Sequence, residues 1–196
     1  MKSTVLANAC VVAALCSGLP AQAAPVSFTV TLNGAAESPS NASPGLGSGM
    51  VVFDTALHTM SLNVSFSGLT GTTSAAHIHC CTALAGAGNV GVATTTPTFA
   101  GFPLGVSSGA YANIFDMTLA SSFNAAFITA NGGTTTSAEM ALFNGALAGK
   151  SYLNLHTSAF GGGEIRGFLV QAVPEPAGLA LTLTALAGLG LLRRRR

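Results

Sequence analysis

Apolar and polar residues alternate with a period of two in several short segments of the chain. The clearest run is Val26–Leu32, which ends at the turn pair Asn33-Gly34, and a second run covers residues 60–66. Alternation of this kind is typical of a strand with one buried face. Further strands are expected at residues 50–53, 75–79, 90–94, 109–119, 151–156 and 164–170. Eight short strands with glycine-rich turns predict an all-β fold, an antiparallel β-sandwich or barrel.

One short helix is expected among these strands. Thr136 and Glu139 have the spacing of a capping box, apolar residues follow them, and Gly149 is placed to end the helix. Residues 122–130 are a weaker candidate for another turn of helix.

The first 23 residues have the pattern of a secretory signal peptide. Lys2 is followed by an apolar run over residues 5–19 and then by Ala21-Gln22-Ala23, which matches an A-x-A cleavage site. We therefore expect signal peptidase to cleave after Ala23 and the chain to be exported.

The last 24 residues have three consecutive parts: a Pro-Glu-Pro motif, an apolar run over residues 177–192, and a basic cluster. As a helix, the apolar run would be roughly 24 Å long, which is shorter than the bilayer core of about 30 Å. It is therefore a marginal transmembrane helix. Arginines after it favour a cytoplasmic end. The residues of the motif and the cluster are Pro174, Glu175, Pro176, Arg193, Arg194, Arg195 and Arg196.

In order and spacing this end resembles the PEP-CTERM sorting signal of Gram-negative bacteria. The resemblance implies a precursor held in the inner membrane and cleavage near residues 174–176 by an exosortase-type peptidase. It further implies a place at the cell surface or in the extracellular matrix, with exopolysaccharide or biofilm as the associated material. A permanent single-span anchor is the alternative.

Residues 24–172 then form one domain with very few charges. It has two basic side chains against five acidic ones, which gives a net charge of −3. So few cations provide no electrostatic surface for nucleic acid. Because 49% of the whole chain is hydrophobic, a folded domain is expected rather than a disordered one.

Several blocks within this domain resemble the CHRD domain, the module repeated in chordin and found singly in bacterial secreted proteins. The opening block is residues 32–37, and the middle block is residues 66–69 followed by residues 75–79. The most specific block is the late one, N-x-H-T at residues 154–157 followed by G-G-E-I-R-G at residues 162–167. The resemblance covers residues 26–170 and implies no settled biochemical activity.

Three histidines are the candidate metal ligands. On a strand His77 and His79 project from one face, and His156 joins them if its strand is adjacent. Imidazole binds copper and zinc. The H-x-H strand also faintly resembles the copper strand of Cu/Zn superoxide dismutases. A secreted copper- or zinc-binding protein is therefore the alternative function. The other interpretation, which we expect, is structural: these histidines hydrogen-bond to backbone atoms or to Glu164.

Cys80 and Cys81 are the only cysteines left after signal cleavage. An exported protein meets an oxidising compartment, so the pair is interpreted first as a vicinal disulfide. Thiolate ligands beside the histidines and an intermolecular crosslink are the alternatives. Strand alternation places Cys81, not Cys80, on the histidine face.

Glu164 and Arg166 complete the candidates as a structural polar cluster. Each is expected to have a charged partner if buried, either the other member of the pair or another acid. No nucleophile–base arrangement or phosphate loop is found in the sequence. We therefore expect no catalytic residue, no assured cofactor and a non-enzymatic domain.

Overall fold

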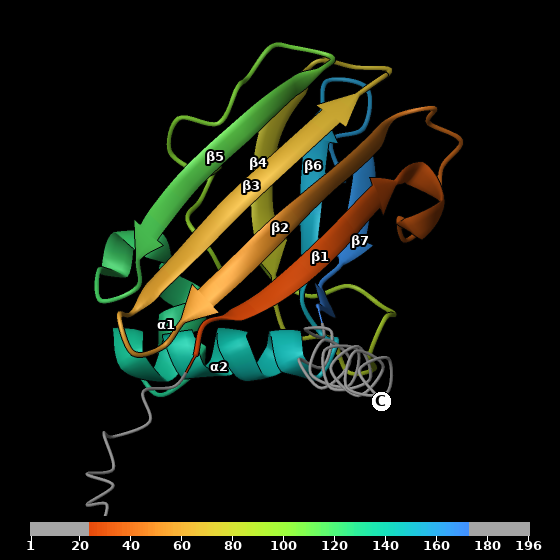
Figure 1. The fold of residues 1–196 in the computed structure, drawn as a ribbon. Coiled ribbons are helices and arrows are strands. Elements are labelled where there is room, and N and C mark those ends of the chain that lie inside the picture. The colour runs from red at the N-terminus through yellow and green to blue at the C-terminus, as the bar shows by residue number, and fades with distance from the viewer. Residues whose placement is uncertain (1–23, 173–196) are drawn as a thin grey trace, which may run out of the picture.

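The computed structural model describes residues 24–172. Eight strands form one antiparallel sheet in the order β4-β6-β7-β1-β2-β3-β5, with β8 paired to β1. The sheet curls into a half-barrel, in which β4, β6 and β7 lie behind β1, β2, β3 and β5 (Figure 1). The predicted antiparallel β fold is confirmed, as one curled sheet. The strands are β1 Val26–Asn33, β2 Leu46–Asp54, β3 Thr59–Ser67, β4 Thr73–His79, β5 Gly109–Asp116, β6 Tyr152–Thr157, β7 Ile165–Phe168 and β8 Val170–Gln171.

The longest helix, α2 (Thr135–Leu147), crosses one end of the half-barrel (Figure 1). Its cap is Thr134, whose side chain accepts from the Ser137 amide, so the capping box starts two residues before the predicted one. Residues 134–137 all carry hydroxyl groups, so each of them could cap the helix. The spacing in the sequence predicted Thr136 as the cap, and this prediction is wrong. Gly149 has a φ of 66°, as expected for the residue that stops the helix.

A shorter helix, α1 (Ala125–Ala130), lies in the segment that the sequence marked as a weaker helical candidate. Two 3₁₀ turns, η1 (Gly34–Ala36) and η2 (Ala120–Ser122), follow β1 and β5 respectively.

The prediction of a strand at residues 90–94 is wrong. This segment makes only isolated bridges, from Val92 to His79 and from Thr94 to Phe123. It lies along the free edge of β4, where the Ala93 amide and the Thr94 hydroxyl bond to the backbone of Ile78. A threonine hydroxyl takes the place of a backbone partner there, so no regular ladder forms.

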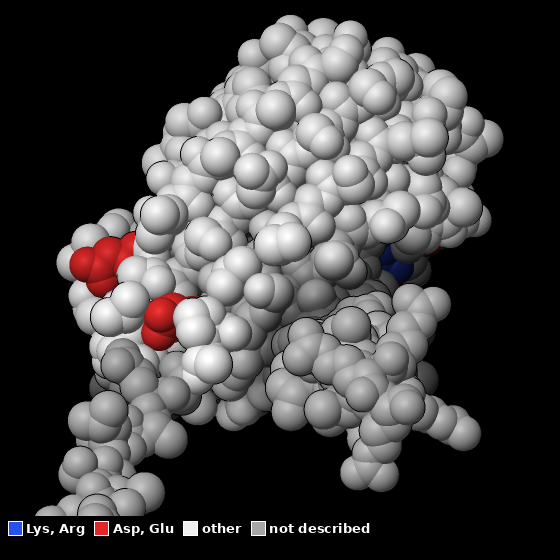
Figure 2. Space-filling view, in the orientation of Figure 1, with Lys and Arg blue, Asp and Glu red and all other residues white. Residues whose placement is uncertain are grey.

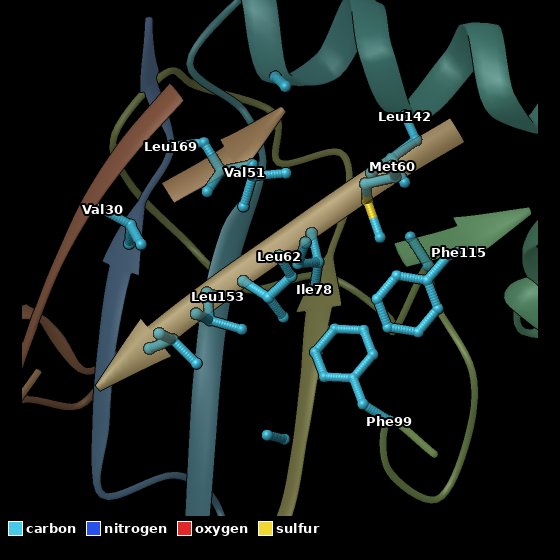
Figure 3. Packing of buried hydrophobic residues seen from close by; sticks show 14 of the residues in the cluster. Val30, Val51, Met60, Leu62, Ile78, Phe99, Phe115, Leu142, Leu153 and Leu169 are labelled. Atoms are coloured by element: carbon cyan, nitrogen blue, oxygen red, sulfur yellow. The ribbon is translucent and has the colours of Figure 1, made fainter. Parts of the chain in front are cut away.

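The core lies inside the curl of the sheet. Alternate residues of β1 and β3 point inward and are fully buried, while their neighbours face solvent. Leu142 of α2 closes this core from one end (Figure 3). Fully buried members also shown there are Met60, Leu62, Ile78, Phe99 and Leu153.

The outer face of β4, β6 and β7 is also buried, unlike the outer face of β1 and β3. Polar side chains on this face lie under the loops, whereas the molecular surface in Figure 2 shows very few charged residues. This buried polar face is where the candidate residues gather.

The expected signal peptide (residues 1–23) and sorting signal (residues 173–196) lie outside the described residues. Within residues 24–172, no helix is both long and apolar enough to cross a membrane.

Candidate functional site

Three histidines meet on the buried polar face. His77 and His79 lie on β4 with Ile78 pointing the other way into the core. β4 pairs with β6, and this register sets His156 opposite Ala75, two residues from His77 along β4 and therefore on the same face. One nitrogen from each imidazole lies within 4.8 Å of the other two. The structure thus fulfils the condition on which the sequence argument for a metal site depended.

Backbone carbonyls orient two of the rings. The Nδ1 of His79 lies 2.7 Å from the Val90 oxygen, and the Nδ1 of His156 lies 2.9 Å from the Gly161 oxygen. Because a carbonyl oxygen only accepts, each Nδ1 carries the proton, and each Nε2 carries a lone pair. Metal-binding histidines are commonly held in this way.

The lone pairs have few partners in the fold. The Nε2 of His79 lies 3.1 Å from the Nδ1 of His77, which donates to it. The Nε2 of His156 is buried, and no hydrogen-bond partner for it exists within residues 24–172. A buried imidazole nitrogen left without a partner is costly, and a metal ion would satisfy it.

All three imidazoles favour the neutral form that binds metals. Burial, reinforced by His156 and His79, lowers the pKa of His77 to about 3. Burial also lowers the pKa of His79 and of His156, although the backbone hydrogen bond of each opposes the shift. The cluster therefore holds no proton that a metal would have to displace at neutral pH.

An aromatic and cationic layer packs beside the histidines. The Tyr152 ring stacks on His79 with centroids 4.6 Å apart, and the Arg166 guanidinium lies 4.7 Å from the centre of the same tyrosine ring. Arg166 also donates to the Gly88 carbonyl and to the Asn89 side chain, in the loop that contains Val90. Arg166 thereby fixes the loop whose carbonyl orients His79.

Arg166 pairs with Glu37 and not with Glu164. Its Nε lies 3.8 Å from Glu37 Oε2, and both side chains are buried. Despite this cation, burial raises the pKa of Glu37 to about 7. Of the two partners left open by the sequence, the structure selects another acid.

Glu164 is the centre of a separate hydrogen-bond network. It lies just before β7, is fully buried, and accepts four hydrogen bonds. Burial alone would raise its pKa, but the hydrogen bonds outweigh burial and lower it. No histidine of the described chain bonds to Glu164, contrary to one expectation. The donors are the hydroxyls of Ser43 and Thr157 and the backbone amides of Thr70 and Gly71.

Cys80 and Cys81 are joined to each other by a disulfide. β4 ends at His79, so strand alternation does not extend to Cys81, and the inference that it shares the histidine face is wrong. The two sulfur atoms instead lie against α2, 3.9 Å and 3.6 Å from the Ala141 carbonyl oxygen.

A family model supplies the identity of this domain. The model of the CHRD domain matches residues 28–169, most of the chain. The chain belongs to the CHRD domain family. CHRD domains are typical of extracellular and secreted proteins. No curated protein and no solved structure matches the chain.

The late block of the CHRD domain supplies much of the buried polar face. Asn154, His156 and Arg166 come from this block, and His77 and His79 come from the middle one. Two members of the site were missed by sequence reasoning, Tyr152 and Glu37. Tyr152 has a usable signal, because it precedes Asn154 and His156 with strand periodicity, whereas the Glu37–Arg166 contact joins distant segments and has none.

Proposed function

We propose that this protein is an exported, non-enzymatic CHRD domain that binds one copper or zinc ion through His77, His79 and His156. The convergence of three neutral imidazole nitrogens within 4.8 Å is the observation that carries the proposal. Nitrogen ligands suit both ions.

The contacts around the rings support this proposal over a purely structural role. A histidine kept only for hydrogen bonding has both ring nitrogens partnered or one in solvent. His156 instead has one nitrogen fixed by Gly161 and the other buried without a partner in the described chain.

Metal titration of the purified protein, freed of metal by a chelator, tests this site. We expect zinc or copper to bind with a stoichiometry of one and to raise the melting temperature. The double variant His77→Ala/His79→Ala is expected to abolish binding. His58→Ala is the matched control, because His58 lies outside the cluster and pairs with Glu139.

Two results would contradict the proposal. One is the absence of stoichiometric binding in the wild-type protein, with the double variant merely less stable. The other is binding that survives the double substitution. Copper-bound protein adds a second readout, because nitrogen couplings in its electron paramagnetic resonance spectrum report imidazole ligands directly.

We further propose that the protein is sorted by an exosortase-type system and resides in the envelope or matrix, associated with exopolysaccharide. This proposal rests on the Pro-Glu-Pro motif, apolar run and arginine cluster of residues 173–196. Intact-mass measurement of native protein tests the processing. The expected mass lacks residues 1–23 and 193–196, and a mass that retains the arginines contradicts the proposal.

A further inference from the structure

A cavity lies between the loop after η1 and the loop after β6, and none of the three histidines lines it. It has a volume of about 320 Å³. Glu37 and residues 38–41 line one side, and Phe160, Gly162 and Gly163 line the other. Ligand sites in proteins range from about 300 to 1,000 Å³, so this cavity suits one ring-sized group.

Two buried side-chain oxygen atoms near Gly163 have no partner within residues 24–172, and the first belongs to Glu37, which lines the cavity. They are Oε1 of Glu37 and Oδ1 of Asn154, on side chains whose residues are only 8% and 3% exposed. Both lie against the cavity wall at Gly163, where a β-carbon would come 2.7 Å from Glu37 Oε1 and 2.6 Å from Asn154 Oδ1. Only glycine leaves both oxygens room, and each of them lacks the hydrogen-bond partner that a buried polar atom normally has.

Charge restricts what that partner can be. The other oxygen of Glu37 already lies 3.8 Å from Arg166. Because burial raises the pKa of Glu37 to about 7, the pair is neutral or carries one positive charge at neutral pH, and it leaves no negative charge for a second cation. A second cation would also be repelled by Arg166 at short range. A neutral hydroxyl group satisfies Glu37 Oε1 without that repulsion.

The opposite wall is apolar. Phe160 is half-buried and lines the cavity beside two glycines, which have no side chains to obstruct a flat ligand. An aromatic ring packs well against the C–H face of another ring. The cavity therefore combines an unpartnered carboxyl oxygen, which can hydrogen-bond to a hydroxyl group, with a surface for an apolar ring face.

We propose that this cavity binds a single neutral sugar unit, with Glu37 hydrogen-bonding to its hydroxyl groups and Phe160 packing on its ring. The inference deepens the exopolysaccharide association proposed above. Its test requires neither metal binding nor sorting.

Titration with free sugars, followed by amide NMR, tests the inference. The probes are D-glucose, D-galactose, D-mannose and N-acetyl-D-glucosamine, with calcium chloride and ethanolamine as cationic competitors. We expect at least one sugar to shift the amide signals of Ser38, Ser40, Asn41 and residues 161–163. Free sugars separate this test from sorting, since failure of exosortase processing leaves their binding unchanged.

Variants then locate the site. Glu37→Gln and Phe160→Leu are each expected to weaken sugar binding about tenfold, through a weakened hydrogen bond and a lost aromatic contact respectively. Glu139→Gln is the matched control, because Glu139 is also buried and has a side-chain partner, His58, but lies outside this cavity.

Three outcomes would overturn the inference. The first is the absence of a shift with any of the four sugars. The second is preferential binding of calcium or ethanolamine, which would show a cation site. The third is sugar binding that Glu37→Gln and Phe160→Leu leave unchanged while other residues shift. Comparable melting curves for the variants ensure that lost binding is not lost folding.

Discussion

Replacing Glu164 by glutamine tests the buried network that anchors the late block of the CHRD domain. Each carboxylate oxygen accepts from one hydroxyl and one backbone amide. Glutamine replaces one oxygen by an NH₂ group, whichever way the side chain turns. A hydroxyl can rotate to accept from that group, but a backbone amide cannot, so one amide loses its partner in a buried position.

The magnitude follows from these contacts. An unsatisfied buried donor costs about 1–3 kcal/mol, and hydrogen bonds to a charged group contribute about 1.5–3 kcal/mol against about 1 kcal/mol for neutral ones. We expect Glu164→Gln to lower the free energy of unfolding by about 3 kcal/mol. In a domain of this size that lowers the melting temperature by about 6–12 °C.

Glu139→Gln is the matched control for this measurement. Glu139 is equally buried but has one partner, the half-exposed His58 at 2.7 Å, so the same substitution is expected to cost less than about 1 kcal/mol. Urea denaturation at pH 7 compares the two variants. Equal destabilisation by the two substitutions would refute the assignment of Glu164 as the anchor.

The difference in the free energy of unfolding between the wild-type protein and Glu164→Gln should also depend on pH. The folded protein holds the pKa of Glu164 below its ordinary value of 4.5, because four hydrogen bonds outweigh burial. Its contribution to stability is therefore full above about pH 4.5 and is lost as the pH falls through the folded pKa. We expect the difference to narrow on acidification, and a constant difference down to pH 3 would contradict this argument.

Three further outcomes are expected. Gly145→Ala should destabilise by about 1–3 kcal/mol, because the new β-carbon would overlap both sulfur atoms of Cys80 and Cys81; Gly91→Ala, with open space around it, should be nearly neutral. Thr134→Ala should cost about 1 kcal/mol in a thermal melt through loss of the α2 cap, whereas Thr136→Ala should not. Mature exported protein should show no titratable thiol before reduction when labelled under denaturing conditions, and two free thiols would exclude the disulfide.

The strands were predictable wherever one face meets the core and the other meets solvent. β1 and β3 satisfy that condition, and the alternation of apolar and polar residues along them predicts both strands. The segment at residues 90–94 shows the same pattern for another reason. Its apolar residues pack against the edge of β4, and side-chain hydroxyls provide part of the bonding, which a period-two count cannot distinguish from a ladder.

The candidate site was predictable only in part. The H-x-H and N-x-H patterns predict which side chains share a face of their strand, because the alternation of side chains depends only on neighbouring residues. Which strands are neighbours is not local, and the pairing of β4 with β6 had to come from the structure. The partners of Glu164 are hydroxyls and backbone amides, and such groups leave no charge signature in a sequence.

One loop connects the two proposed sites, and this connection can be tested. The loop at residues 158–163 provides the Gly161 carbonyl that orients His156 and the wall formed by Phe160 and Gly163. Thr157 precedes the loop and donates to Glu164, which follows it, so the Glu164 network fastens both ends. Glu164→Gln is therefore expected to weaken zinc binding and sugar binding together.

The histidine and cavity variants should separate the two effects. His77→Ala/His79→Ala is expected to abolish zinc binding and leave the sugar titration unchanged, since neither histidine lines the cavity. Phe160→Leu should weaken sugar binding alone, because it leaves the Gly161 carbonyl and the three imidazoles in place. If Glu164→Gln affected only one ligand, the loop would not be a shared support, and each site would have its own means of positioning.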